Sequence, residues 1–216
     1  YVSFEWVYRW SHELCDANIA VPQYAQYMEP YKTRHKHSLQ RNNKNTGYYV
    51  WPKETLIDYT FPDVLDRICE EFPNQYAFRY TELDYTRTYP EFRDDVDTFA
   101  RALLAMGVKK GDHVAIWATN VPQWYITFWA TTKIGAVLVT VNTAYKIHEA
   151  EYLLRQSDTH TLVMIDGYKD SDYISIINEI CPELKSSLPG LLNSRRLPFL
   201  KNVISCGSSI PGTYSW

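Results

Sequence analysis

The fold is decided by Gly111–Ser157, GDHVAIWATNVPQWYITFWATTKIGAVLVTVNTAYKIHEAEYLLRQS. Two short, mostly apolar runs, residues 113–118 and 136–141, are typical of buried strands, and each is followed by a longer stretch that predicts a helix. Strands that alternate with helices pair in parallel and are covered on both faces. The stretch therefore predicts part of a buried parallel sheet. Because α/β proteins place ligands at the ends of such strands, functional residues are sought here first.

Three residues mark the ends of the first helix in this stretch. Asn120 is expected to be its N-cap, since an Asn side-chain oxygen accepts an unpaired backbone N–H. Pro122 fits the first turn, where its missing N–H costs little. Gly135 can adopt the left-handed conformation that ends a helix. The helix is therefore predicted between Asn120 and Gly135.

The same alternation extends in both directions from this stretch. Before it, the pattern predicts a helix over 64–72, a β-hairpin of strands 76–80 and 85–89, and a long helix over 92–106. After it, the pattern predicts a helix over 147–156, a strand over 161–165, a helix over 173–180, a loop over 183–198 and a strand over 202–205. We expect an α/β fold: a parallel sheet layered with flanking helices, doubly wound or similar, plus a small β-hairpin.

Residues 1–53 give weaker patterns and are expected to be a separate helical and loop segment preceding an α/β subdomain over 54–216. Candidate helices lie around Phe4–Cys15 and after Pro22. The basic run Lys32–Arg41 suggests a solvated loop, with an anion-binding patch as the alternative. His35 and His37 in this run could share a metal only with further ligands that the sequence does not indicate.

Composition limits the classes of partner. The net charge of −3 over 216 residues provides no global basic field for nucleic acid. No apolar run reaches the roughly 18 residues of a membrane span, and no secretory signal pattern is found. Cys15, Cys69, Cys181 and Cys206 are widely spaced and are expected to be reduced thiols. We therefore expect a cytoplasmic protein.

Common catalytic motifs are missing from the sequence. It contains no GxGxxG, GxxxxGK[ST] or GxSxG pattern. Gly207–Ser209 is followed by no lysine, which favours a surface turn. His148 and Glu149 begin like a zinc-protease helix, but Tyr152 stands where the second His must be.

Two groups of acidic residues could in principle bind a hard cation, but neither has calcium-loop spacing. A position near a helix start explains both groups, through the helix dipole for the first and capping for the second. The two groups are Asp94, Asp95 and Asp97, and Asp166, Asp170 and Asp172. From the residues alone we assign no catalytic, cofactor-binding or metal-binding residue.

Four short sequence motifs resemble those of the AMP-forming adenylating enzymes. This family includes acyl-CoA synthetases, luciferases and peptide-synthetase adenylation domains. The four motifs are TYPEF at 88–92, ATNVPQW at 118–124, TTKIGAVLVTVN at 131–142 and NTAY at 142–145. The resemblance extends from about Glu54 to Trp216. The residues of these motifs are closer to those of acyl-CoA synthetases than to those of peptide-synthetase domains. Thr143 departs from the family's usual proline.

The resemblance implies a ligase that activates a carboxylic acid, expected to be a fatty acid, with ATP and Mg²⁺ and transfers the acyl group to CoA. The family's Gly-rich phosphate loop, adenine- and ribose-binding residues and catalytic lysine lie beyond its second motif and have no counterpart here. We therefore expect an N-terminal fragment, truncated before the phosphate-binding loop, that binds no cofactor and is inactive alone.

Other classes of function stay open at this point. A non-catalytic interaction or dimerisation module could use the same fold, and the Tyr- and Trp-rich first 50 residues would suit a protein-binding surface. A homodimer is possible in either case. A metal hydrolase built on the Asp or His clusters is the third hypothesis.

Overall fold

The computed structural model describes residues 59–216, which form one compact unit. The predictions made for Phe4–Cys15, for the helix after Pro22 and for the basic run Lys32–Arg41, with His35 and His37, lie outside the described residues. Among the helices of the described part, none is long and apolar enough to cross a bilayer.

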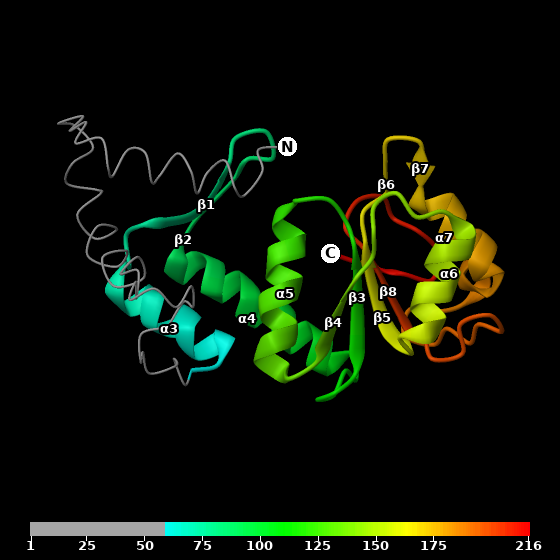
Figure 1. Ribbon diagram of the computed structural model, residues 1–216, viewed down its shortest axis with the longest axis horizontal. Helices are drawn as coiled ribbons and strands as arrows, with labels where there is room; N and C mark the ends of the chain where they lie inside the picture. The colour runs from blue at the N-terminus through cyan, green and yellow to red at the C-terminus, as the bar shows by residue number, and fades with distance from the viewer. Residues whose placement is uncertain (1–58) are drawn as a thin grey trace, which may run out of the picture. The chain divides into compact units, whose positions relative to one another are not determined.

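A parallel sheet forms the centre of the unit, as predicted, and it has five strands (Figure 1). Its strands lie in the order β4-β3-β5-β8-β9. Their bounds are β3 His113–Trp117, β4 Val137–Thr140, β5 Thr159–Met164, β8 Asn202–Ser205 and β9 Tyr214–Ser215. Numbered along the chain, the strands run 2-1-3-4-5, which is one of the two common doubly wound orders.

Successive side chains of β3 enter different cores. Val114 and Ile116 pack with the helices on one face, and Ala115 and Trp117 pack with those on the other. All four are fully buried. This alternation follows from the two-residue period of a strand and explains why a continuous apolar run is needed where both faces are covered.

Helices cover both faces of the sheet (Figure 1). On one side lie α3, α4 and α5, and on the other lie α6 and α7. Their bounds are α3 Phe61–Glu71, α4 Tyr89–Ala105, α5 Pro122–Ile134, α6 Ile147–Gln156 and α7 Tyr173–Ile180. The α/β layers and the helices predicted within residues 59–216 are thus confirmed, with small differences at the helix ends.

The β-hairpin before α4 is also confirmed. It pairs β1, Tyr76–Tyr80, with β2, Tyr85–Thr88, in antiparallel register. Asp84 adopts a left-handed conformation in the turn, with φ of 47°, which Asp tolerates better than most residues. A second, smaller hairpin joins β6, Gly167–Tyr168, to β7, Ser171–Asp172.

Helix ends follow local signals, with one correction. The Glu91 carboxylate accepts hydrogen bonds from the backbone N–H and the hydroxyl of Thr88, which fixes the start of α4. Gly135 ends α5 in the left-handed region, as predicted. The prediction of Asn120 as N-cap of α5 is wrong: the N-cap is Val121, whose side chain makes no capping bond. Pro122 in the first turn is sufficient to set the helical φ.

The C-terminal quarter differs from prediction in two ways. The expected loop begins with a short 3₁₀-helix, η1, Pro182–Ser186. The last strand, β9, was not predicted, because two residues are too short to show a period. The sheet thereby gains a fifth strand next to β8.

An ion pair attaches the segment after η1 to helix α6. Arg196 donates from its Nε to the Glu151 carboxylate at 2.8 Å and from a second nitrogen to the other carboxylate oxygen. The side chain of Glu151 is 18% exposed. This bidentate hydrogen bonding lowers the pKa of Glu151 below its ordinary value of 4.5.

This ion pair gives a pH-dependent contribution to stability. A lowered folded-state pKa stabilises the fold above the unfolded value, and the contribution disappears as pH falls through the folded pKa. Glu151→Gln is expected to lower the free energy of unfolding by about 1 kcal/mol at pH 7 and by less as pH drops below 4.5. Urea titrations at several pH values measure this. Glu70→Gln, at an exposed site on α3, is the control, and a pH-independent Glu151→Gln effect would contradict the assignment.

Candidate functional site

The strand order reverses between β3 and β5. In a doubly wound sheet, the carboxyl ends of the strands at this reversal border the crevice where ligands bind. Here the chain leaves β3 through residues 118–121 and leaves β5 through residues 165–166. This edge contains part of the stretch that the sequence singled out.

The turn after β4 is fixed by packing and hydrogen bonds. Trp117 stacks on Tyr173 with ring centroids 4.0 Å apart, and its indole N–H donates to the Asn142 carbonyl at 3.2 Å. The Tyr173 hydroxyl donates to the Thr143 carbonyl at 2.8 Å. Asn142 Oδ1 accepts from the Ala144 N–H at 2.9 Å. These groups satisfy one another, so the turn has a structural role.

The Gly207–Ser209 turn lies at the same edge. The Asp166 carboxylate accepts from the Ser208 backbone N–H at 2.9 Å and from its hydroxyl at 2.6 Å. Ser205 Oγ donates to the Ser208 carbonyl at 2.7 Å. The turn is thus closed by its own chain, and no lysine contributes to it. This agrees with a surface turn and differs from a phosphate cradle.

The other acidic residues have structural partners. Asp172 caps α7 by accepting from the Ser175 N–H, as predicted. Asp170 pairs with Lys146, and Asp97 pairs with Lys133. Within residues 59–216, no three His, Cys, Asp or Glu side chains are placed to hold a metal ion. His148 is exposed on α6.

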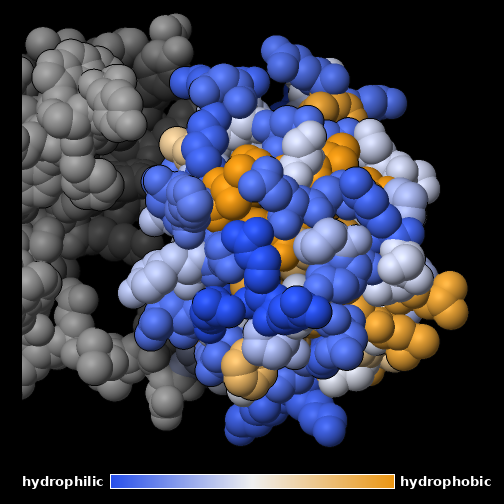
Figure 2. Space-filling model, turned by 90° about the vertical axis from the view of Figure 1, so that its right-hand side faces the viewer, coloured by the Kyte–Doolittle hydropathy of each residue, from blue (hydrophilic) through white to orange (hydrophobic). Residues whose placement is uncertain are grey.

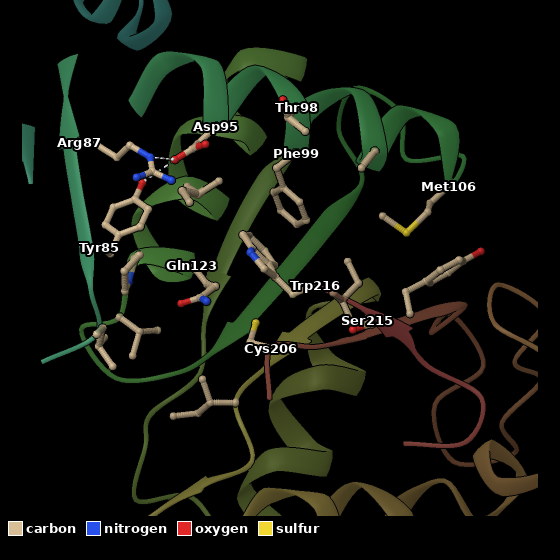
Figure 3. A pocket seen from close by; sticks show the side chains of 18 of the residues that line it. Tyr85, Arg87, Asp95, Thr98, Phe99, Met106, Gln123, Cys206, Ser215 and Trp216 are labelled. Atoms are coloured by element: carbon tan, nitrogen blue, oxygen red, sulfur yellow. Dashed lines mark hydrogen bonds and ion pairs between the residues drawn. The ribbon is translucent and has the colours of Figure 1, made fainter. Parts of the chain in front are cut away.

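A cleft of about 830 Å³ opens on the α4 side of the sheet (Figure 3). Its walls come from the β1–β2 hairpin, α4, the start of α5 and the ends of β8 and β9. Most lining side chains are apolar, including Phe99, Met106, Ile126 and Ile204. Trp216 lies against Phe99, with ring centroids 4.3 Å apart. The cleft can therefore accommodate apolar groups.

One end of the cleft is polar. Tyr85 and Arg87 of the hairpin both donate to the same oxygen of Asp95 on α4, each at 2.9 Å (Figure 3). Burial and this hydrogen bond raise the pKa of Tyr85 above its ordinary value. Because Asp95 is neutralised by Arg87 and bonded twice, it is not a free general base.

The thiol in the cleft is unsuited to nucleophilic chemistry. Cys206 lines the cleft between the sheet and Trp216. Burial raises the pKa of this thiol to about 12, and the thiolate is the reactive form. Sequence reasoning missed the cleft because its walls come from segments more than 100 residues apart.

Comparison with known proteins identifies the family. The family model described as AMP-binding enzyme matches residues 65–207. The chain is 43% identical over 162 residues to "Putative acyl-CoA synthetase YngI" of Bacillus subtilis (strain 168). It is 35% identical over 158 residues to the mitochondrial medium-chain acyl-CoA ligase ACSF2 of Rattus norvegicus. These alignments cover 74% and 73% of the chain but only 30% and 26% of the relatives.

Solved structures show the same fold. Acetoacetyl-CoA synthetase from Streptomyces lividans aligns with a TM-score of 0.58 and 25% identity, over 73% of this chain and 24% of that one. A fatty acyl CoA synthetase of Mycobacterium tuberculosis aligns with a TM-score of 0.58 and 20% identity, over 68% and 26%. The family model covers well over half of the residues, and the resemblance of the four sequence motifs is thereby confirmed: the chain belongs to the AMP-binding enzyme family.

Proposed function

We propose that this chain is the N-terminal part of an acyl-CoA synthetase. The complete enzyme would use ATP and Mg²⁺ to convert a carboxylic acid to an acyl-adenylate and would transfer the acyl group to the thiol of CoA. The observation that carries the proposal is the 43% identity to an acyl-CoA synthetase over 162 residues. A medium-chain ligase among the relatives supports a fatty acid as the substrate.

The role of this part would be to provide scaffold. The doubly wound sheet, with its edge turns closed by Asp166–Ser208 and Trp117–Asn142, would form one wall of the active-site cleft. In residues 59–216 the polar groups of this edge bond to one another, so we assign ATP, Mg²⁺ and CoA binding to segments that this chain does not contain. The chain alone would then be inactive.

The cytoplasm is the location we propose. Cys69, Cys181 and Cys206 are free thiols, which is typical of a reducing compartment.

The test is acyl-CoA formation by the complete gene product, with acids of increasing chain length. We expect pyrophosphate release that requires both ATP and a medium-chain acid, and an acyl-CoA product detected by mass spectrometry when CoA is added. Pyrophosphate release without any acyl-CoA product would contradict the ligase assignment. No reaction with any acid would favour the alternative, a non-catalytic interaction or dimerisation module with this fold.

A further inference from the structure

Two exposed leucines flank a tight turn after η1. The Leu191 N–H donates to the Leu188 carbonyl at 3.0 Å. Between them, Pro189 and Gly190 are the residues that a type II turn prefers, and Gly190 has a φ of +81°. The side chains of Leu188 and Leu191 are 69% and 70% exposed. The turn therefore holds two large apolar side chains in solvent, next to each other.

The turn is held in place by its surroundings. A Cβ added at Gly190 would lie 2.5 Å from Tyr214 Oη and 3.6 Å from Asn202 Oδ1, so the turn backbone lies directly against β8 and β9. The next residue, Leu192, is 1% exposed. The packing of Gly190 against β8 and β9 and the burial of Leu192 both hold the backbone in place. The two exposed leucines therefore cannot turn inward without breaking this packing.

A second proline turn presents another apolar residue. The Leu200 N–H donates to the Leu197 carbonyl at 3.1 Å, and both leucines are buried. Between them stand Pro198 and Phe199, whose side chain is 53% exposed. In this turn the flanking leucines anchor the chain, and Phe199 between them is the apolar side chain that projects.

The charged residues of this segment are all cationic, although the Glu183 carboxylate of η1 accepts a hydrogen bond from the Arg195 backbone N–H. From Lys185 to Lys201 the sequence contains four cationic residues and no Asp or Glu, although the whole chain carries a net charge of −3. Arg196 is paired with Glu151. Among the ion pairs of residues 59–216, none includes Lys185, Arg195 or Lys201. We call residues 185–201 the basic–apolar loop.

We propose that the basic–apolar loop docks the protein on an anionic lipid bilayer. Leu188, Leu191 and Phe199 would enter the headgroup boundary, and the unpaired cations would lie among the lipid phosphates. Figure 2 shows the side of the molecule bearing α6 and α7, where apolar side chains protrude beside strongly hydrophilic ones.

A lipid surface suits this loop better than a protein partner does. A stable protein interface buries roughly 800 Å² on each side around an apolar core. Here only three apolar side chains project, from two turns in a segment whose charged residues are all cationic. Many equivalent lipid phosphates can neutralise these cations without a shaped partner surface. The cytoplasmic leaflet carries such a charge, which agrees with the proposed location.

The experiment is co-sedimentation of the 216-residue chain with vesicles of equal parts phosphatidylcholine and phosphatidylserine, compared with phosphatidylcholine alone. We expect binding to the anionic vesicles that weakens with added salt. Arg195→Gln is expected to weaken binding about fivefold, corresponding to about 1 kcal/mol for one cation near the surface. The double variant Leu188→Ser, Leu191→Ser is expected to weaken it by more than about tenfold.

Matched controls lie on the opposite layer. Leu104→Ser removes a leucine that is 54% exposed on α4, and Lys109→Gln removes an exposed cation after it. Both are expected to bind like the unaltered chain, with circular dichroism confirming that all variants are folded. Equal binding of loop and control variants would overturn the proposal. So would a change in oligomeric state, without a change in vesicle binding, for the leucine double variant.

Discussion

Trp117→Ala is expected to lower the free energy of unfolding by about 3–5 kcal/mol, the range for removing a fully buried aromatic side chain. Trp117 is 0% exposed, stacks on Tyr173 and bonds to the Asn142 carbonyl. The substitution leaves a cavity between β3 and α7 and frees a carbonyl in the turn after β4. Urea unfolding followed by circular dichroism measures the change.

Two variants separate the causes. Trp117→Phe keeps a ring against Tyr173 but loses the indole N–H, and is expected to be intermediate, with a loss of about 1–3 kcal/mol. Tyr152→Ala, at a site 69% exposed on α6, is expected to change stability by no more than about 0.5 kcal/mol. If Trp117→Ala unfolds at the same urea concentration as Tyr152→Ala, the described packing across this face is wrong.

Gly212→Ala is the second substitution with a large expected effect. Gly212 has a φ of +78°, and a Cβ there would lie 2.1 Å from the Leu184 carbonyl oxygen, which is backbone and cannot rotate away. The left-handed conformation costs about 1–2 kcal/mol, and overpacking adds about 1–3 kcal/mol. We therefore expect a loss of about 2–5 kcal/mol in the free energy of unfolding.

Gly107→Ala is the matched control for this effect. Gly107 also has a positive φ, of +86°, but nothing lies within 4 Å of an added Cβ. Gly107→Ala is therefore expected to lower the free energy of unfolding only by the cost of the left-handed backbone conformation, about 1–2 kcal/mol. Equal losses for Gly107→Ala and Gly212→Ala would show that the segment before β9 does not pack on η1 as described.

Most of the fold could be predicted because its signals are local. From Val114 to Trp117 the run at β3 is apolar because helices cover both faces, and Gly135 ends α5 because its φ of 73° suits glycine. Helices α6 and α7 were predicted with their observed bounds, since their apolar periodicity is clean. The N-cap of α5 was wrongly predicted at Asn120, because the preference of Asn for the N-cap position is only statistical. Pro122 alone can begin a helix.

What the sequence could not indicate depends on long-range packing. β9 exists because Tyr214 and Ser215 lie beside β8, and nothing local in two residues signals this. The cleft has walls from β2, α4, α5 and β9, so it appears only once the chain is folded. The outward direction of Leu188 and Leu191 likewise depends on the contact of Gly190 with Tyr214.

That this chain contributes no catalytic residue stays a prediction. Polar side chains at the carboxyl edge, such as Asp166 and Ser208, are engaged with each other. Short sequence motifs indicated the family because turns and helix starts need particular residues. The start of α4, where Glu91 bonds to Thr88, is an example. These motifs identify the family, and we propose that the chemistry belongs to other segments of the enzyme.

Calorimetric titration of MgATP into the 216-residue chain and into the complete gene product tests this account most directly. We expect heat of binding for the complete enzyme and none at micromolar concentrations for the 216-residue chain, because the groups proposed to hold the phosphates lie outside it. Micromolar binding of ATP by the 216-residue chain would contradict the account, as would failure of the complete gene product to bind ATP.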